Sequence, residues 1–187
     1  MPELRSPISE EDDQIIGPAD ALVTLVEYGD YQCPHCQAAW PEVELVLSHF
    51  GDDLCYAYRH FPMSTVHPLA KPAAEAAEFA GAHGLFWEMH SAIYANAHQL
   101  SGVALFALAS KLGLDVAELR NALEAGTYAP KVDADFFSGI RSGVNGTPCF
   151  FVNGERHDGA YDAATLATAI EATATAVPSN VVRIAVE

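Results

Sequence analysis

The order of apolar and polar positions predicts strands near both ends of the chain and helices between them. Residues 21–28 form a β-branched apolar run that turn-forming residues end, as is typical of a buried strand. Residues 54–61 alternate and are rich in aromatic side chains, so we expect a second strand that ends at Pro62. Between the two strands, the apolar positions of residues 37–47 indicate a helix.

The middle of the chain, from Pro68 to about Gly143, is rich in alanine and predicts several consecutive helices. The expected helical segments are 70–82, 85–97, 103–112, 116–123 and 131–140. Asp115 and Glu118 predict a capping box at the start of the fourth helix, and Gly126 predicts its end. These helices are too many for one crossover connection, so we interpret residues 63–143 as an inserted helical subdomain.

Strand-like residues return after the helices. An apolar run at 149–152 follows Pro148, and Asn153-Gly154 predicts a tight hairpin turn into residues 155–157. Residues 163–174 predict a closing helix, and the apolar residues 181–186 suit a further strand.

Composition and charge narrow the class of protein. A chain of 187 residues suits one domain, or a core domain with an insertion, and a hydrophobic fraction of 50% excludes disorder. Lys and Arg number 9 against 25 Asp and Glu, and the net charge of −16 disfavours nucleic acid and anionic membranes as partners. Because no apolar leader or membrane-spanning run is visible, we expect a cytoplasmic protein, with a periplasmic location if an export signal has been trimmed.

The most informative motif is Cys33-Pro34-His35-Cys36, which lies between the first strand and the following helix. Two thiols so spaced can close a reversible disulfide. The N–H groups at the helix start favour a thiolate at Cys33, which we expect to be the nucleophile with a lowered pKa, and Cys36 to be the buried resolving thiol. Pro34 suits an early helical position, and His35 can donate to a thiolate or place a positive charge near it. Both favour the reduced pair, and hence oxidation of other thiols.

Metal binding is the main alternative for these residue types. A structural zinc site usually needs a second ligand pair, whereas the chain offers only the separate Cys55 and Cys149. His83, His90 and His98 are spaced by seven and eight residues, but a glycine interrupts the helix between the first two. We therefore expect no metal, and we interpret Cys55 as a buried strand residue.

Several segments together carry a resemblance to a known family. Residues 17–36, 58–62, 86–90 and 146–154 occur in the order typical of the DsbA-like branch of the thioredoxin superfamily, which this sequence resembles over most of its length. The resemblance implies an α/β thioredoxin fold with an inserted helical subdomain. Residues 1–62 and 144–187 would then form the thioredoxin-like domain, and residues 63–143 the insertion.

The resemblance also implies roles for individual residues. Cys33 would attack and form a mixed disulfide, and Cys36 would resolve it. Thr147 and Pro148 would form a cis-proline loop that faces the dithiol and pairs with the substrate backbone. Glu27 matches an acidic residue that in relatives lies beneath the pair and exchanges protons with the resolving thiol. The alternative for Glu27 is a carboxylate at a strand end that faces water.

Two features depart from the family pattern. Cys149 directly follows the proline, where relatives often carry threonine, and we expect a plain buried thiol rather than one that faces the dithiol. No export signal is visible, and a cytoplasmic member would meet a pool of reducing thiols. Such a member would act as a reductase, an isomerase or a detoxifying enzyme.

These observations lead us to expect a thiol-disulfide oxidoreductase that acts on protein thiols or on small thiols such as glutathione. We expect no organic cofactor, no nucleic acid and no membrane partner, and the direction of electron flow stays open. One alternative is a glutathione-dependent isomerase or transferase on the same fold, although such relatives often lack the second cysteine. Another is a non-catalytic module that holds an extended peptide against the Thr147-Pro148 loop.

Overall fold

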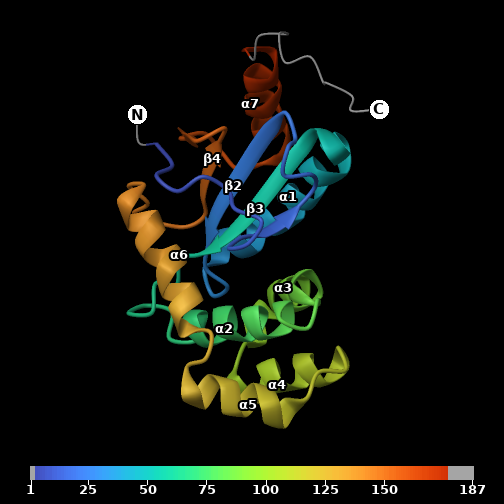
Figure 1. Cartoon of the computed structure of the whole chain (residues 1–187), viewed down its shortest axis with the longest axis vertical. Coiled ribbons are helices and arrows are strands. Elements are labelled where there is room, and N and C mark those ends of the chain that lie inside the picture. The colour runs from blue at the N-terminus through green and yellow to red at the C-terminus, as the bar shows by residue number, and fades with distance from the viewer. Residues whose placement is uncertain (1–2, 177–187) are drawn as a thin grey trace.

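A five-stranded mixed sheet lies at the centre of this computed structural model, which describes residues 3–176 (Figure 1). The order across the sheet is β1-β3-β2-β4-β5, in which β2 and β3 pair in parallel and the other neighbours pair antiparallel. The strands are β1 (Gln14–Ile16), β2 (Val23–Gly29), β3 (Leu54–His60), β4 (Cys149–Val152) and β5 (Glu155–His157). This arrangement confirms the expected thioredoxin fold.

The short edge strand β1 was not predicted from the sequence. It has three half-buried residues and pairs with β3 from Gln14 opposite Tyr58 to Ile16 opposite Tyr56. Three residues are too few to show a period of two, so the strand depends on a tertiary partner rather than on its own pattern. The further strand expected at residues 181–186 lies outside the described residues.

The alternation along β2 divides the core between the two faces of the sheet. Val23 and Leu25 belong to the larger core, together with buried side chains of α1 (Pro34–Phe50) and α7 (Ala163–Ala176). Val26 and Tyr28 belong to a smaller core on the opposite face, against which α6 (Ala129–Arg141) packs. Each β2 residue therefore has an assigned face, which decides what its side chain can reach.

The remaining helices lie beyond one end of the sheet, and α6 runs back from them alongside the strands (Figure 1). They are α2 (Ala70–Gly81), α3 (Phe86–Ala95), α4 (Gly102–Lys111) and α5 (Val116–Ala125), close to the predicted segments. The Asp115 side chain accepts hydrogen bonds from the N–H groups of Ala117 and Glu118, and Gly126 ends α5 in the left-handed conformation. No helix in the described range is both long and apolar enough to span a membrane.

α6 contacts the sheet as well as the inserted helices. The rings of Phe136 and Phe61 stack with centroids 4.6 Å apart, and the Tyr28 hydroxyl lies 2.8 Å from the Ser138 hydroxyl. The predicted boundary between residues 63–143 and the thioredoxin-like domain thus runs through a packed interface, and the division itself stays a prediction.

The hairpin between β4 and β5 has the predicted turn. Asn153 and Gly154 have φ angles of 45° and 83°, the positive values that a type I′ turn requires. The Asn153 carboxamide also accepts a hydrogen bond from the Thr24 N–H at 2.7 Å, which connects the turn to the start of β2.

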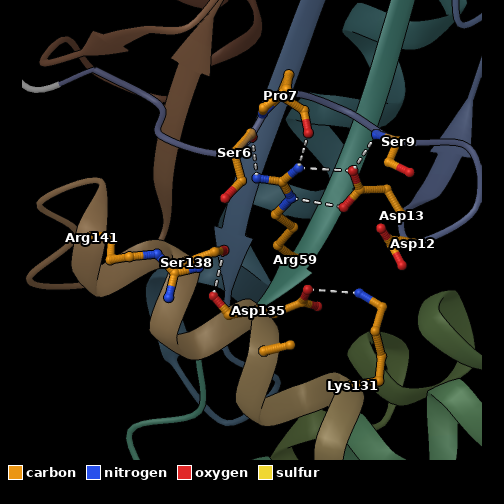
Figure 2. A pocket seen from close by; sticks show the side chains of 11 residues that line it. Ser6, Pro7, Ser9, Asp12, Asp13, Arg59, Lys131, Asp135, Ser138 and Arg141 are labelled. Carbon is orange, nitrogen blue, oxygen red and sulfur yellow. Dashed lines mark hydrogen bonds and ion pairs between the residues drawn. The ribbon is translucent and has the colours of Figure 1, made fainter.

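A buried arginine of β3 holds the N-terminal segment against the sheet (Figure 2). Arg59 donates from Nε and Nη2 to the two carboxylate oxygens of Asp13, at 2.7 and 2.8 Å. Its other bonds go to the carbonyl groups of Ser6 and Pro7 and to the Tyr28 hydroxyl. The guanidinium therefore satisfies all five of its donors with protein groups, beside a cavity of about 240 Å³.

The Asp13→Asn substitution tests the importance of this pair. It leaves the buried Arg59 charge uncompensated, and breaking a buried pair typically costs about 3–5 kcal/mol. We expect urea unfolding to show a loss of that size in the free energy of unfolding. The control is Asp133→Asn, which breaks the partly exposed pair with Lys71 and should cost less than about 1 kcal/mol. Similar losses in the two variants would contradict the prediction.

Candidate active site

The Cys33-Pro34-His35-Cys36 segment forms the start of α1. Cys33 is the N-cap residue, with an extended backbone (φ −71°, ψ 121°), and Pro34 follows at the first helical position, where its missing N–H costs nothing. Cys33 is 4% exposed and Cys36 is fully buried, while Pro34 and His35 face the solvent. Both cysteines are free thiols in this structure.

The surroundings of Cys33 favour its thiolate. The pKa of Cys33 is lowered to about 5, chiefly by the hydrogen bond with the Cys36 thiol, which outweighs the effect of burial. Hydrogen bonding to the backbone N–H groups of Cys36 and His35 acts in the same direction. The direction is the one expected for a cysteine at a helix start.

The imidazole of His35 contacts Tyr161. Its Nδ1 lies 3.2 Å from the hydroxyl of Tyr161, and the two rings meet edge to face. The contribution of His35 to the lowered pKa of Cys33 comes from its backbone N–H. Residue 35 therefore acts on the Cys33 pKa through its backbone N–H at the start of α1.

Cys36 has the opposite electrostatic character. Burial raises its pKa well above the ordinary value, and the hydrogen bond with Cys33 and the charge of Glu27 add to the shift. The N–H of Asp30 donates to Cys36 Sγ at 3.4 Å. In the reduced state the pair is thus one thiolate-favouring sulfur and one buried thiol, one helical turn apart.

Glu27 is buried, so the interpretation as a water-facing carboxylate is wrong. It is 1% exposed and alternates with Val26 and Tyr28, which places it on the face of β2 that α1 covers. Its Oε2 accepts a hydrogen bond from the Tyr56 hydroxyl at 2.7 Å. Burial raises the pKa of Glu27 to about 7, the bond from Tyr56 opposes the shift, and the Cys33 charge adds to it.

The Thr147-Pro148 loop lies next to the dithiol, although Thr147 is 114 residues from Cys33 in the sequence. The peptide bond between these residues is cis, and the Thr147 carbonyl lies 3.3 Å from Cys33 Sγ, which donates to it as a thiol. The Thr147 hydroxyl is buried and has no partner in this reduced state. The loop thereby contacts the Cys33 sulfur, as predicted.

The other two cysteines lie apart from this site. Cys149 stands opposite Tyr28 in the β2–β4 pairing and packs in the smaller core, on the face away from α1. Cys55 is a fully buried residue of β3. Both are plain buried thiols, as predicted.

A cluster of three buried titratable side chains was not predicted. His60, Glu78 and Asp135 bring possible ligand atoms within 4.8 Å of one another, the one such group of three among residues 3–176. Protein groups occupy most of these atoms. His60 Nε2 bonds Glu78 at 2.9 Å, and Asp135 accepts from Lys131 Nζ and from the His60 N–H, whereas His60 Nδ1 is buried without a partner. The three residues lie far apart in the sequence, so no spacing signalled them.

The three histidines weighed as ligands do not gather in the described part of the chain. His90 is fully buried among aromatic rings, with Nδ1 2.9 Å from the Tyr31 hydroxyl. His83 is partly exposed and contacts the Phe79 carbonyl, and His98 lies in the 3-10 turn Ala97–Gln99.

The comparisons with known proteins agree with the fold. A family model described as thioredoxin matches residues 9–172. A thioredoxin-like oxidoreductase from Silicibacter pomeroyi has a TM-score of 0.74 and 26% identity, covering 89% of this chain and 95% of that one. Alpha-DsbA1 from Wolbachia pipientis has a TM-score of 0.78 and 16% identity, covering 90% of this chain and 94% of that one.

A curated relative is much longer than this chain. The Na(+)/H(+) antiporter NhaA 1 of Salinispora arenicola is 42% identical over 168 residues, which are 90% of this chain and 26% of that protein. The chain thus spans about a quarter of the length of the curated relatives it matches.

The raised pKa of Glu27 predicts a pH-dependent cost to stability. The pKa is about 7 when folded and 4.5 otherwise, so the unfolded chain releases this proton first as pH rises. The cost is absent below 4.5, grows as pH rises, and is complete above 7, where it reaches about 3 kcal/mol. Relative to the parent, a Glu27→Gln variant should gain that much unfolding free energy between pH 4 and pH 8, measured by urea unfolding of the reduced protein.

The matched control for this prediction is Glu44→Gln, which changes an exposed carboxylate of the same helix that carries the dithiol. Its difference from the parent should be constant with pH to within about 0.5 kcal/mol. A constant difference for Glu27→Gln as well would contradict the prediction.

Proposed function

We propose that this chain, which belongs to the thioredoxin family whose model matches residues 9–172, is a DsbA-like thiol-disulfide oxidoreductase that works through Cys33 and Cys36. The observation that supports this most strongly is the unequal pair of sulfurs. The low pKa of the less buried Cys33 gives a nucleophile, and the high pKa of the fully buried Cys36 gives a resolving thiol.

In the reductive direction the Cys33 thiolate attacks one sulfur of a substrate disulfide. A bond forms between Cys33 Sγ and that sulfur, and the second substrate sulfur leaves with the electron pair as a thiolate. Cys36 then loses its proton and attacks Cys33 Sγ, which releases the first substrate sulfur. The substrate gains two electrons and the chain holds a Cys33–Cys36 disulfide. Oxidation of substrate thiols is the same sequence in reverse.

The second step needs an acceptor for the Cys36 proton, and we assign this to Glu27. The carboxylate is buried with a pKa of about 7, so it can gain and lose a proton near neutral pH. Its charge also acts on Cys36, whose pKa it raises. A proton passed to Glu27 removes that charge at the moment Cys36 becomes a thiolate.

The Thr147-Pro148 loop is the proposed substrate-binding element. The Thr147 carbonyl lies next to Cys33 Sγ, where the backbone of a bound polypeptide would have to pass. Protein thiols and disulfides are therefore the favoured substrates, and glutathione is the small-thiol candidate. The cytoplasmic location and the absence of an organic cofactor also stay predictions.

Cysteine variants test the order of the two thiols. Cys36→Ser should accumulate a mixed disulfide with a peptide disulfide, because the attacking sulfur remains and the resolving one is lost. Cys33→Ser should form none, and its turnover should fall by roughly a hundredfold or more. Mass spectrometry after acid quenching measures the adduct, with Cys149→Ser as the control that keeps the dithiol. An adduct on Cys36 in Cys33→Ser would reverse the assignment.

The pH dependence of alkylation tests the nucleophile. Because the thiolate reacts, the rate of iodoacetamide modification at Cys33 should reach half its plateau near pH 5 and stay high above pH 7. Peptide mapping by mass spectrometry identifies the modified residue. The buried Cys55 and Cys149, whose pKa values are raised, serve as internal controls that should stay unmodified in the folded chain. A midpoint near pH 9 at Cys33 would contradict the proposal.

The same experiments separate the alternative functions. A glutathione-dependent isomerase or transferase would keep its turnover in Cys36→Ser, since that chemistry needs one thiol. A non-catalytic peptide-binding module would bind peptide equally well in Cys33→Ser and show no turnover in either protein.

The curated relatives favour a second candidate role. A segment similar to nine-tenths of this chain makes up about a quarter of a protein named as a Na(+)/H(+) antiporter. We propose as the alternative that the dithiol acts on such an antiporter. Antiport in vesicles that hold the Salinispora arenicola relative, measured with added reduced, oxidised or Cys33→Ser chain, tests this. Equal antiport rates under the three conditions would contradict this alternative.

A further inference from the structure

Asp30 lies between β2 and the dithiol and is 1% exposed. Its carboxylate is fully engaged at short distance. Oδ1 accepts from the Gln32 N–H at 2.8 Å, and Oδ2 accepts from the Met63 N–H and from His67 Nδ1, both at 2.8 Å. Three donors from two different segments therefore hold this side chain in one position.

The backbone of Asp30 contacts both cysteines. Its N–H donates to Cys36 Sγ at 3.4 Å, and its carbonyl accepts from the Cys33 N–H at 3.0 Å. Gln32 adds a second connection, because its side-chain carbonyl accepts from the Leu69 N–H at the start of α2. The loop before the dithiol is thus connected to the segment of residues 63–69 through Asp30 and Gln32.

We propose that Asp30 is a positioning residue for the second step of thiol exchange. Its fixed carboxylate holds the Asp30 N–H against Cys36 Sγ, where the donor stabilises the thiolate that attacks the mixed disulfide. In that step a bond forms between Cys36 Sγ and Cys33 Sγ, and the substrate sulfur leaves with the electron pair. The inference rests on the proposed oxidoreductase function and assigns a residue to it.

The placement of this donor is what makes it specific for one step. Cys36 is fully buried, and no water-exposed surface is available to stabilise its charge. A hydrogen bond to a charged acceptor is stronger than one between neutral groups, so the Asp30 N–H is worth most when Cys36 is a thiolate. The first step uses Cys33, whose low pKa depends on Cys36 and the helix start rather than on the Asp30 carboxylate.

Asp13 supplies a matched comparison within the chain. It is also a buried aspartate whose carboxylate accepts several hydrogen bonds, in this case from Arg59 and the Ser9 N–H. Its partners belong to the N-terminal segment and to the face of β3 away from α1. Asp13→Ala therefore controls for a loss of stability without a change at the dithiol.

The test measures the two steps separately in the chain of residues 1–187. The rate of Cys33 alkylation at pH 7 reports the attacking sulfur, and the rate at which a preformed mixed disulfide with a fluorescent peptide resolves reports Cys36. In Asp30→Ala the alkylation rate should stay within about threefold of the parent, and resolution should slow by about tenfold. Asp30→Asn keeps one acceptor oxygen, so its resolution rate should lie between those of the parent and Asp30→Ala. Asp13→Ala should resolve the mixed disulfide at the parent rate.

His67→Ala keeps the inference testable if Asp30→Ala does not fold. It removes one of the three donors from a partly exposed side chain, and resolution should slow by about threefold. His67→Asn, which can still donate, should recover the parent rate. Unchanged resolution in the Asp30 and His67 variants, or equal slowing in Asp13→Ala, would overturn the inference. If the parent chain itself forms no mixed disulfide, it is the proposed function that fails.

Discussion

The N-cap position of Cys33 on α1 is the constraint on which the rest of the site depends. At a helix start the backbone N–H groups have no partners within the helix, and an anionic sulfur supplies one. One turn further along, Cys36 is enclosed by the core, where the N–H of Asp30 donates to its sulfur. Two chemically identical side chains thereby acquire opposite preferences for the proton from their position alone.

The strand β2 contributes to this difference between Cys33 and Cys36. The alternation along β2 sends Glu27 toward α1 and Tyr28 toward the opposite core, so a single strand supplies both the acid under the dithiol and the packing on the other face. Burying an acid is unfavourable unless it is hydrogen-bonded, and one bond from Tyr56 only partly offsets the cost at Glu27. The raised pKa is the visible sign of that cost, and it places the acid where a proton can move near neutral pH.

Much of this architecture could be predicted from local sequence. The β-branched run, the Asp115 cap, the Asn153-Gly154 turn and the cysteine spacing each carry their own local physical signal, and the corresponding elements are present. The sequence could not reveal features made by distant residues. β1 depends on its pairing with β3, and the His60, Glu78 and Asp135 cluster joins a strand to two helices. The direction of Glu27 was also undecided, because both faces of a central strand are apolar and the sequence does not show which one α1 covers.

The burial of Cys55 and Cys149 has a consequence for how this chain must mature. An unfolded chain exposes four thiols that can join in several pairings, whereas the folded chain leaves only the Cys33 and Cys36 sulfurs next to each other. Folding thus has to precede exposure to an oxidant if a single product is to form. The hydrophobic core then works as a protecting group, which withholds two cysteines from chemistry for as long as the native packing lasts.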